Sequence, residues 1–245
     1  TIGTNNGDST FGGIIQDAAG GPGSITKTGA GTLTLTNANT HSGITRINEG
    51  TLIIQIADAL QNSVVEINLD DGLDVQTRAN IGGLAGSGDL NLGPRNLYIL
   101  GAAHTLYTGA VTGSTGVFSH EDGGSLTVNG PDAGIAIRRV YINSGGNIIF
   151  ENSAVLDVEI DFKIGYSAGS ADFTVKSGAT ANTEDVILGV HGSSVGTALV
   201  TGVGSQWNAS QLLIGGDTSS RNGGTAQLSV TDNGHFEVSD FVKFW

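Results

Sequence analysis

The sequence predicts an all-β fold, and within that class a parallel β-helix, or solenoid. Apolar residues alternate with polar ones in short runs such as Thr32–Thr36 and Leu156–Ile164, which is the period of a strand rather than of a helix. Clusters of Gly, Asn, Asp and Ser separate the runs and favour turns. Related segments also recur along the chain, which is the signature of a repeat architecture. Units this short cannot bury an apolar face alone, so we expect them to stack as coils.

The elements follow from this alternation in order. In Leu156–Ile164 the apolar side chains point to one side, while Asp157, Glu159, Asp161 and Lys163 point to the other. Asp58–Asn62 predicts one helical turn, and the longest predicted loops are residues 16–24, 56–63 and 217–224. Inward positions are expected at Leu33, Leu35, Val158, Ile160, Val186 and Leu188. The other expected strands are Leu52–Ile54, Val64–Leu69, Leu90–Leu92, Leu97–Leu100, Leu126–Val128, Ile148–Phe150, Val186–Leu188, Leu212–Ile214 and Leu228–Val230.

Two families of internal repeats favour the solenoid over its main alternative, an antiparallel sandwich or jelly roll. Phe162–Gly165, Val186–Gly189 and Leu212–Gly215 align with one another at nearly even spacing. A longer, diverged repeat relates Thr10–Ile15 to Leu106–Val111. At roughly 22 residues per coil the chain makes about 11 coils. We expect one domain over residues 1–245, with modules at 1–80, 81–154 and 155–245.

Composition excludes several functional classes. The 245 residues include no cysteine, so disulfide scaffolds and thiolate metal sites are excluded. There are 23 acidic and 10 basic residues, a net charge of −13, so no nucleic-acid partner is expected. No run of about 20 apolar residues marks a membrane-spanning helix.

The segment Ile25–Leu52 reads ITKTGAGTLTLTNANTHSGITRINEGTL. It resembles the passenger-associated transport repeat of bacterial autotransporters, with His41 where Tyr is usual. Residues 116–150 resemble a degraded second copy, and residues 162–245 resemble another passenger repeat with the motif Val200–Trp207. The resemblance implies a right-handed parallel β-helix that is secreted by the type V route. It also implies a location outside the cell or on the outer-membrane surface, and a C-terminal membrane β-barrel as the partner during secretion.

The residues that could carry catalysis form weak patterns. The histidines show no metal-ligand spacing, and His120–Asp122 is interpreted as a solvated turn. Gly165–Gly169 matches the Gly-x-Ser-x-Gly motif, but a strand follows it where a hydrolase needs a helix. The carboxylates of Asp70, Asp71 and Asp74, or of the run from Asp157 to Asp161, could serve a polysaccharide-cleaving enzyme or hold a divalent cation. A solvated outer face is the favoured interpretation, so no catalytic residue, metal or cofactor is predicted.

Binding is therefore the predicted activity, as an adhesin or as a secreted ligand of a host cell-surface protein or receptor. The alternatives are a β-helical polysaccharide-active enzyme and a structural stalk. Amphipathic aromatic side chains and charged outward positions are the expected contacts. The candidate binding residues are Tyr98, Tyr107, Arg138, Arg139, Asp157, Glu159 and Asp161.

Overall fold

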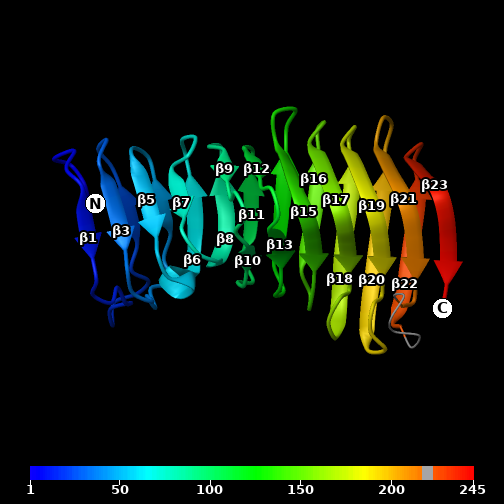
Figure 1. Ribbon diagram of the computed structural model, residues 1–245, viewed down its shortest axis with the longest axis horizontal. Helices are drawn as coiled ribbons and strands as arrows, with labels where there is room; N and C mark the ends of the chain where they lie inside the picture. Colours follow the sequence, from blue (N-terminus) through cyan, green and yellow to red (C-terminus); the bar gives the residue numbers. More distant parts are fainter. Residues whose placement is uncertain (217–222) are drawn as a thin grey trace.

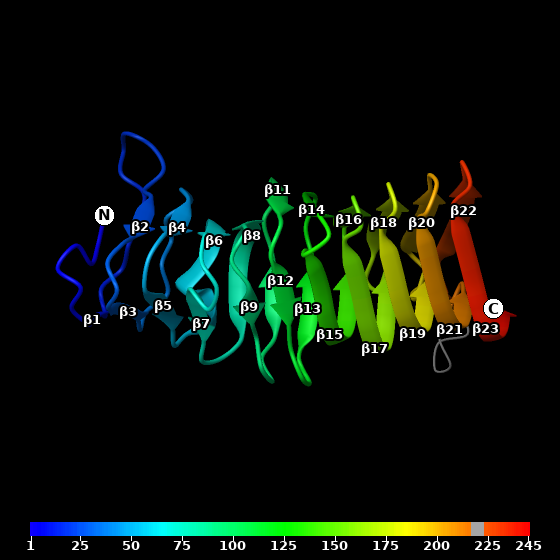
Figure 2. The same ribbon diagram turned by 90° about the horizontal axis from the view of Figure 1, so that it is seen from above.

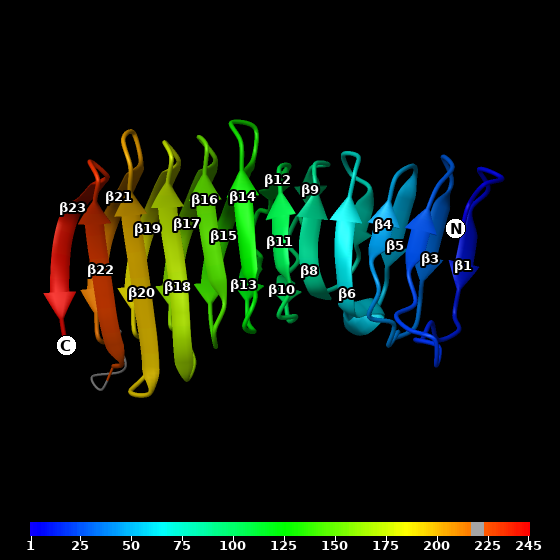
Figure 3. The same cartoon turned by 180° about the vertical axis from the view of Figure 1, so that it is seen from behind.

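Parallel strands stacked in successive turns build the whole rod, which has about nine turns (Figure 1). The computed structural model describes residues 1–216 and 223–245. Every strand-to-strand ladder among the described residues is parallel, and a single 3-10 turn, η1 (Ala57–Ala59), is the helical element. The predicted all-β parallel solenoid is confirmed. The two ends of the chain lie at opposite ends of the rod, as the view from behind also shows (Figure 3).

The strands form three stacks, which we name face 1, face 2 and face 3 in the order in which each turn visits them. Face 1 contains β1 (Ser9–Phe11), β3 (Thr32–Leu35), β5 (Thr51–Ile54), β7 (Leu73–Val75), β9 (Leu90–Asn91) and β12 (Ala110–Thr112). Face 2 contains β10 (Leu97–Ile99) and β13 (Val117–His120). The first residues of β6 (Leu60–Ile67) and β8 (Ala79–Gly86) also lie on face 2, before these two strands continue into face 3. Five long strands run through face 1 and then face 2: β15 (Gly134–Ile142), β17 (Val155–Ile164), β19 (Thr180–Leu188), β21 (Gln206–Ile214) and β23 (His235–Phe244).

Face 3 is one uninterrupted stack along the rod (Figure 2). It contains β2 (Ile25–Lys27), β4 (Thr45–Ile47), β6 (Leu60–Ile67), β8 (Ala79–Gly86), β11 (His104–Tyr107), β14 (Ser125–Asn129), β16 (Asn147–Glu151), β18 (Gly169–Lys176), β20 (Ser194–Thr201) and β22 (Thr225–Thr231). The register joins one position of each strand from coil to coil: Lys27, Ile47, Ile67, Gly86, Tyr107, Val128, Phe150, Val175, Val200 and Val230.

The number of residues in each turn increases along the rod. In the N-terminal coils the register of face 3 advances by a short step, as from Lys27 to Ile47. The step is longer from Phe150 to Val175, and it is longest from Val200 to Val230. The expectation of about 11 coils was higher than the about nine turns of the rod, which the face 3 register covers in nine steps from Lys27 to Val230. Part of the added length lies in face 3, where β14 and β16 have five residues each and β18 and β20 have eight.

The core is a continuous column of alternate side chains from all three faces. Leu33, Leu35, Val158, Val186 and Leu188 are buried as predicted. Ile160 is the exception, because it is only partly buried. It lies at a bulge, where β17 places Glu159 and Ile160 between two registered pairs and each neighbouring strand places one residue. Here the chain turns from face 1 to face 2, and alternation restarts in the opposite phase.

The predicted turn and loops are confirmed in part. Residues 16–24 form a protruding connection between β1 and β2 (Figure 2). The predicted loop 56–63 contains η1 and then the first residues of β6, so half of it is strand. Most of the predicted loop 217–224 lies outside the described residues.

None of the helical segments in the described part of the chain has the length and apolarity that a membrane crossing needs.

Candidate functional site

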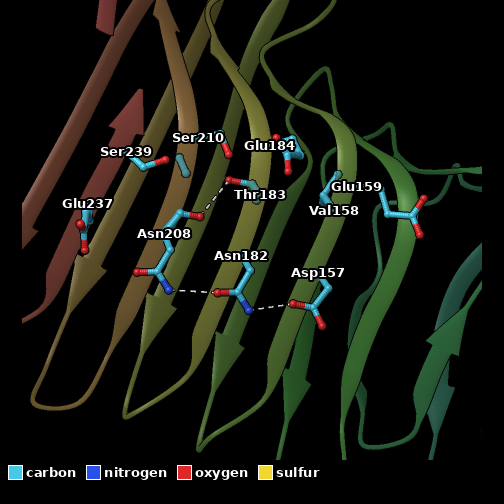
Figure 4. A pocket seen from close by; sticks show the side chains of 11 residues that line it. Asp157, Val158, Glu159, Asn182, Thr183, Glu184, Asn208, Ser210, Glu237 and Ser239 are labelled. Atoms are coloured by element: carbon cyan, nitrogen blue, oxygen red, sulfur yellow. Dashed lines mark hydrogen bonds between the residues drawn. The ribbon is translucent and has the colours of Figure 1, made fainter. Parts of the chain in front are cut away.

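An open groove of about 480 Å³ runs along the bend between faces 1 and 2 in the last third of the rod (Figure 4). Its residues come from the four long strands β17, β19, β21 and β23. Four carboxylates line it, and none of the described lining residues is Lys, Arg or His. The lining residues are Asp157, Val158, Glu159, Asn182, Thr183, Glu184, Asn208, Ala209, Ser210, Glu237 and Ser239.

Parallel register sets one wall of this groove. Asp157, Asn182, Asn208 and Glu237 occupy the same outward position in four successive coils. The Asn182 amide donates to Asp157 Oδ1 at 2.7 Å, and the Asn208 amide donates to Asn182 Oδ1 at 3.0 Å. These bonds run along the rod (Figure 4). The ladder fixes the polar side chains in one row, so the wall is preorganised before any partner arrives.

The bend supplies the second wall. Glu159, Glu184, Ser210 and Ser239 each follow an inward residue at the point where the strand turns toward face 2. Behind the groove, the buried Trp207 donates from Nε1 to Thr183 Oγ1 at 3.0 Å. The floor is therefore tied directly to the aromatic part of the core.

Negative charge accumulates beside the groove on face 2. Asp161 and Asp185 are direct neighbours in the parallel register. Burial raises the pKa of the Asp185 carboxyl, and the carboxylates of Asp161 and Glu184 raise it further. One ion pair offsets this charge, between Arg139 Nε and Asp161 Oδ2 at 3.1 Å. At the far end of the groove His235 Nε2 lies 3.6 Å from Glu237 Oε2.

The structure brings some of the predicted binding residues together and separates others. Asp157 and Glu159 line the groove, and Arg138 stands at the same bend one coil earlier. Arg139 and Asp161 pair with each other on face 2. Tyr98 is farther along face 2, where the Arg78 guanidinium lies 5.5 Å from its ring centroid.

Tyr107 requires a correction, because its side chain is fully buried and belongs to the core. Its hydroxyl donates to Gly88 O at 2.6 Å, and burial raises the pKa of the phenol. A buried Tyr whose hydroxyl finds an internal acceptor is stable inside a core. Tyr107 therefore offers no surface for a partner.

Of the residues that line the groove, only Asp157 and Glu159 were among the predicted binding residues. Asn182, Asn208 and Glu237 follow Asp157 at one position per coil. The repeat that begins at Phe162, Val186 and Leu212 has nearly the same spacing. Projecting that repeat onto the outward positions would have found this row.

The catalytic motifs weighed above do not assemble into a site. Ser167 of the Gly-x-Ser-x-Gly match lies 3.1 Å from the Ser144 hydroxyl, Oγ to Oγ. In the cluster His120–Asp122, the Glu121 carboxylate accepts hydrogen bonds from Ser119 and Asn143, while His120 is buried. The described residues contain no group of three or more His, Cys, Asp or Glu side chains placed to hold a metal ion.

We expect EDTA to leave the melting temperature of the protein unchanged. Calcium takes about six to eight oxygen ligands, and the four groove carboxylates are spread over three coils and two outward rows. The measurement is thermal unfolding followed by circular dichroism, with and without EDTA. A fall of more than a few degrees on adding EDTA, reversed by calcium, would contradict the expectation.

Comparison with known proteins gives two matches. The family model of the passenger-associated transport repeat matches residues 25–54. A curated protein, the adhesin BmaC autotransporter of Brucella suis biovar 1 (strain 1330), is 32% identical over 167 residues. That alignment covers 64% of this chain and 5% of BmaC, so the chain spans about a twentieth of its relative. No solved structure matches the chain.

Proposed function

We propose that this chain, a segment of an autotransporter passenger domain, is an adhesin-type binding surface that holds a basic segment of a host cell-surface protein in the groove between faces 1 and 2. The match to the passenger repeat supports a location outside the bacterium or on its outer-membrane surface. BmaC, the relative, is named as an adhesin. A binding role for this chain is consistent with both.

The observation that carries the proposal is the groove lined by four carboxylates with no cation among its described lining residues. Unneutralised carboxylates on a preorganised wall attract Lys and Arg side chains of a partner, and they accelerate association at low salt. The alternative enzymatic role is less well supported. A lyase needs a cationic group beside its acids to stabilise the developing anion, and the described groove lining offers none.

The test neutralises the groove without changing its shape. The triple variant Glu159→Gln, Glu184→Gln, Glu237→Gln should bind host-cell membranes about 3- to 150-fold more weakly than the native chain, since each neutralised contact costs about 0.2–1 kcal/mol. Its binding should also depend less on salt. The measurement is retention of the purified chain on host-cell membranes in low-salt and in high-salt buffer.

The matched control carries the same change in net charge on exposed acids outside the groove lining, Asp71→Asn, Asp122→Asn and Asp132→Asn. We expect this control to bind like the native chain, and both triple variants to keep the native melting temperature, because exposed charges contribute little to stability. An equal loss of binding in the two variants would mean that net charge alone determines binding. Release of shortened glycans from the membranes by the native chain would favour the enzyme.

A further inference from the structure

Two of the five histidines are enclosed in the rod, and both lie in its N-terminal half. His41 and His120 are each 1% exposed, whereas His104, His191 and His235 are exposed. Neither enclosed histidine takes part in the proposed groove. A histidine is the side chain whose charge ordinarily changes between about pH 5 and 8. The stability of a coil that encloses a histidine therefore depends on pH.

His120 occupies an aliphatic position of the core. In the register of face 2 it stacks between Ile99 of β10 and Ile142 of β15. Both of its ring nitrogens lack a hydrogen-bond partner. A β-carbon built on Gly146 would stand 2.7 Å from His120 Nδ1, so the backbone at Gly146 closes against the ring. The ring has neither a hydrogen-bond acceptor nor a counter-ion with which to share a proton.

Among the described residues, no carboxylate lies where it could stabilise a protonated His120 ring. Glu121 and Asp122 are the acids closest to His120 in the chain, but the Glu121 carboxylate accepts a hydrogen bond from the Ser119 hydroxyl and Asp122 is exposed in the turn. Strands β10 and β15 place aliphatic side chains against the ring. Burial accordingly lowers the pKa of His120 to about 4.

His41 is enclosed at the turn that leads into β4. Its Nε2 lies 3.0 Å from Thr45 Oγ1, and Thr45 Oγ1 lies 2.8 Å from Ser63 Oγ of β6, while Nδ1 has no partner. The charged group that faces it is Asp17 of the protruding loop, whose carboxylate is already bonded to Ser42 and Gly23. Burial lowers the pKa of His41, and Asp17 opposes this only in part.

We propose that the N-terminal half of the rod is an acid-labile segment, in which the coils around His41 and His120 open at mildly acidic pH while the coils of residues 155–216 and 223–245 stay stacked. Each coil of a solenoid contacts only its neighbours, so one part can open while the rest remains folded. The C-terminal coils contain no enclosed histidine among their described residues. Acid would thus loosen coils in the N-terminal half of the rod and leave the groove in place.

The direction of the pH dependence follows from proton binding to the opened and the stacked coil. In an opened coil His120 takes its ordinary pKa of 6.5, whereas in the stacked coil it stays neutral down to about pH 4. The opened form therefore gains a proton as pH falls through 6.5, and opening becomes easier until about pH 4, below which no further change is expected. At about pH 5 the population of the opened form should rise about 30-fold from this one group.

The experiment is hydrogen–deuterium exchange of the 245-residue chain at about pH 7.5 and about pH 5, with rates corrected for intrinsic exchange. We expect amides of residues 97–129 to lose on the order of 30-fold protection at the acidic pH, and those of 25–67 to lose protection also. Amides of residues 155–214 should keep theirs. His120→Leu, which continues the aliphatic stack, should abolish the loss in 97–129 only, and His41→Tyr the loss in 25–67 only.

The exposed His104 provides the matched control, because His104→Gln should behave as the native chain does at both pH values. Uniform loss of protection along the rod, or loss that begins in residues 155–214, would overturn the proposal. So would a His120→Leu variant that loses protection as the native chain does. If that variant fails to fold, an NMR titration of the native His120 ring decides, and titration of the folded protein near the ordinary histidine pKa overturns the proposal.

Discussion

Replacing Trp207 by alanine is expected to lower the free energy of unfolding of the C-terminal coils by about 3–5 kcal/mol, the usual cost of removing a large buried aromatic side chain. Trp207 is fully buried. Its ring centroid lies 5.8 Å from that of Phe162, 5.1 Å from that of Phe173 and 5.1 Å from that of Phe236. One truncation therefore leaves a cavity facing three aromatic rings from three other strands.

The effect should be local, because a solenoid transmits a defect only through neighbouring coils. In hydrogen exchange or limited proteolysis, Trp207→Ala should open residues 173–214 while residues 25–129 keep native protection. Trp207→Phe serves as the matched control, since it keeps an aromatic ring and should cost less than alanine. It loses the hydrogen bond to Thr183, at about 1 kcal/mol, and part of the indole volume. A uniform loss of protection over the whole chain would show that the rod unfolds as one cooperative unit.

Gly86→Ala should be comparably damaging in the middle of the rod. Gly86 ends β8 with φ of +105°, a conformation that side-chain-bearing residues rarely adopt. A β-carbon there would stand 2.1 Å from Ile67 O of the preceding coil. Backbone strain and steric conflict each cost about 1–3 kcal/mol, so we expect a loss of about 2–5 kcal/mol in the free energy of unfolding.

Chemical denaturation followed by circular dichroism measures this loss. Gly20→Ala is its matched control, because a β-carbon at Gly20 meets no atom within 4 Å and its φ is not in the left-handed region. The control should unfold within about 0.5 kcal/mol of the native chain. A Gly86→Ala protein as stable as this control would show that the stack adjusts at Ile67 without cost.

The fold could be predicted because the period-two alternation and the repeats along the chain both require strands that bury one face against a shared interior. Leu33 and Leu188 must face a shared interior, and a coil of about 20 to 30 residues can provide that interior only by stacking on its neighbours. The alternation could not place Ile160, because a bulge at the bend inserts a residue and shifts the phase. The bulge is defined by the register of β17 with the strands of the neighbouring coils, which the local sequence does not show.

The candidate site was harder to predict for two reasons. Tyr107 and Leu106 are adjacent and both apolar enough to be inward, yet Leu106 is 52% exposed and Tyr107 is buried, since the phenol finds its acceptor at Gly88 O in the coil below. The groove depends on residues such as Asn182 and Glu237, which are distant in sequence and occupy one outward row only after stacking. Parallel register, rather than local sequence, creates both the burial and the row.

The uninterrupted backbone ladder of face 3 has a mechanical consequence. Its hydrogen bonds point along the rod axis, so tension between the two ends loads all the interfaces between coils in series, and the weakest interface separates first. Each detached coil replaces about 4.8 Å of rod with up to about 70–100 Å of extended chain. A rod held at one end and gripped at its side groove would lengthen stepwise under flow, and this extension would limit the force that reaches the bond with its partner.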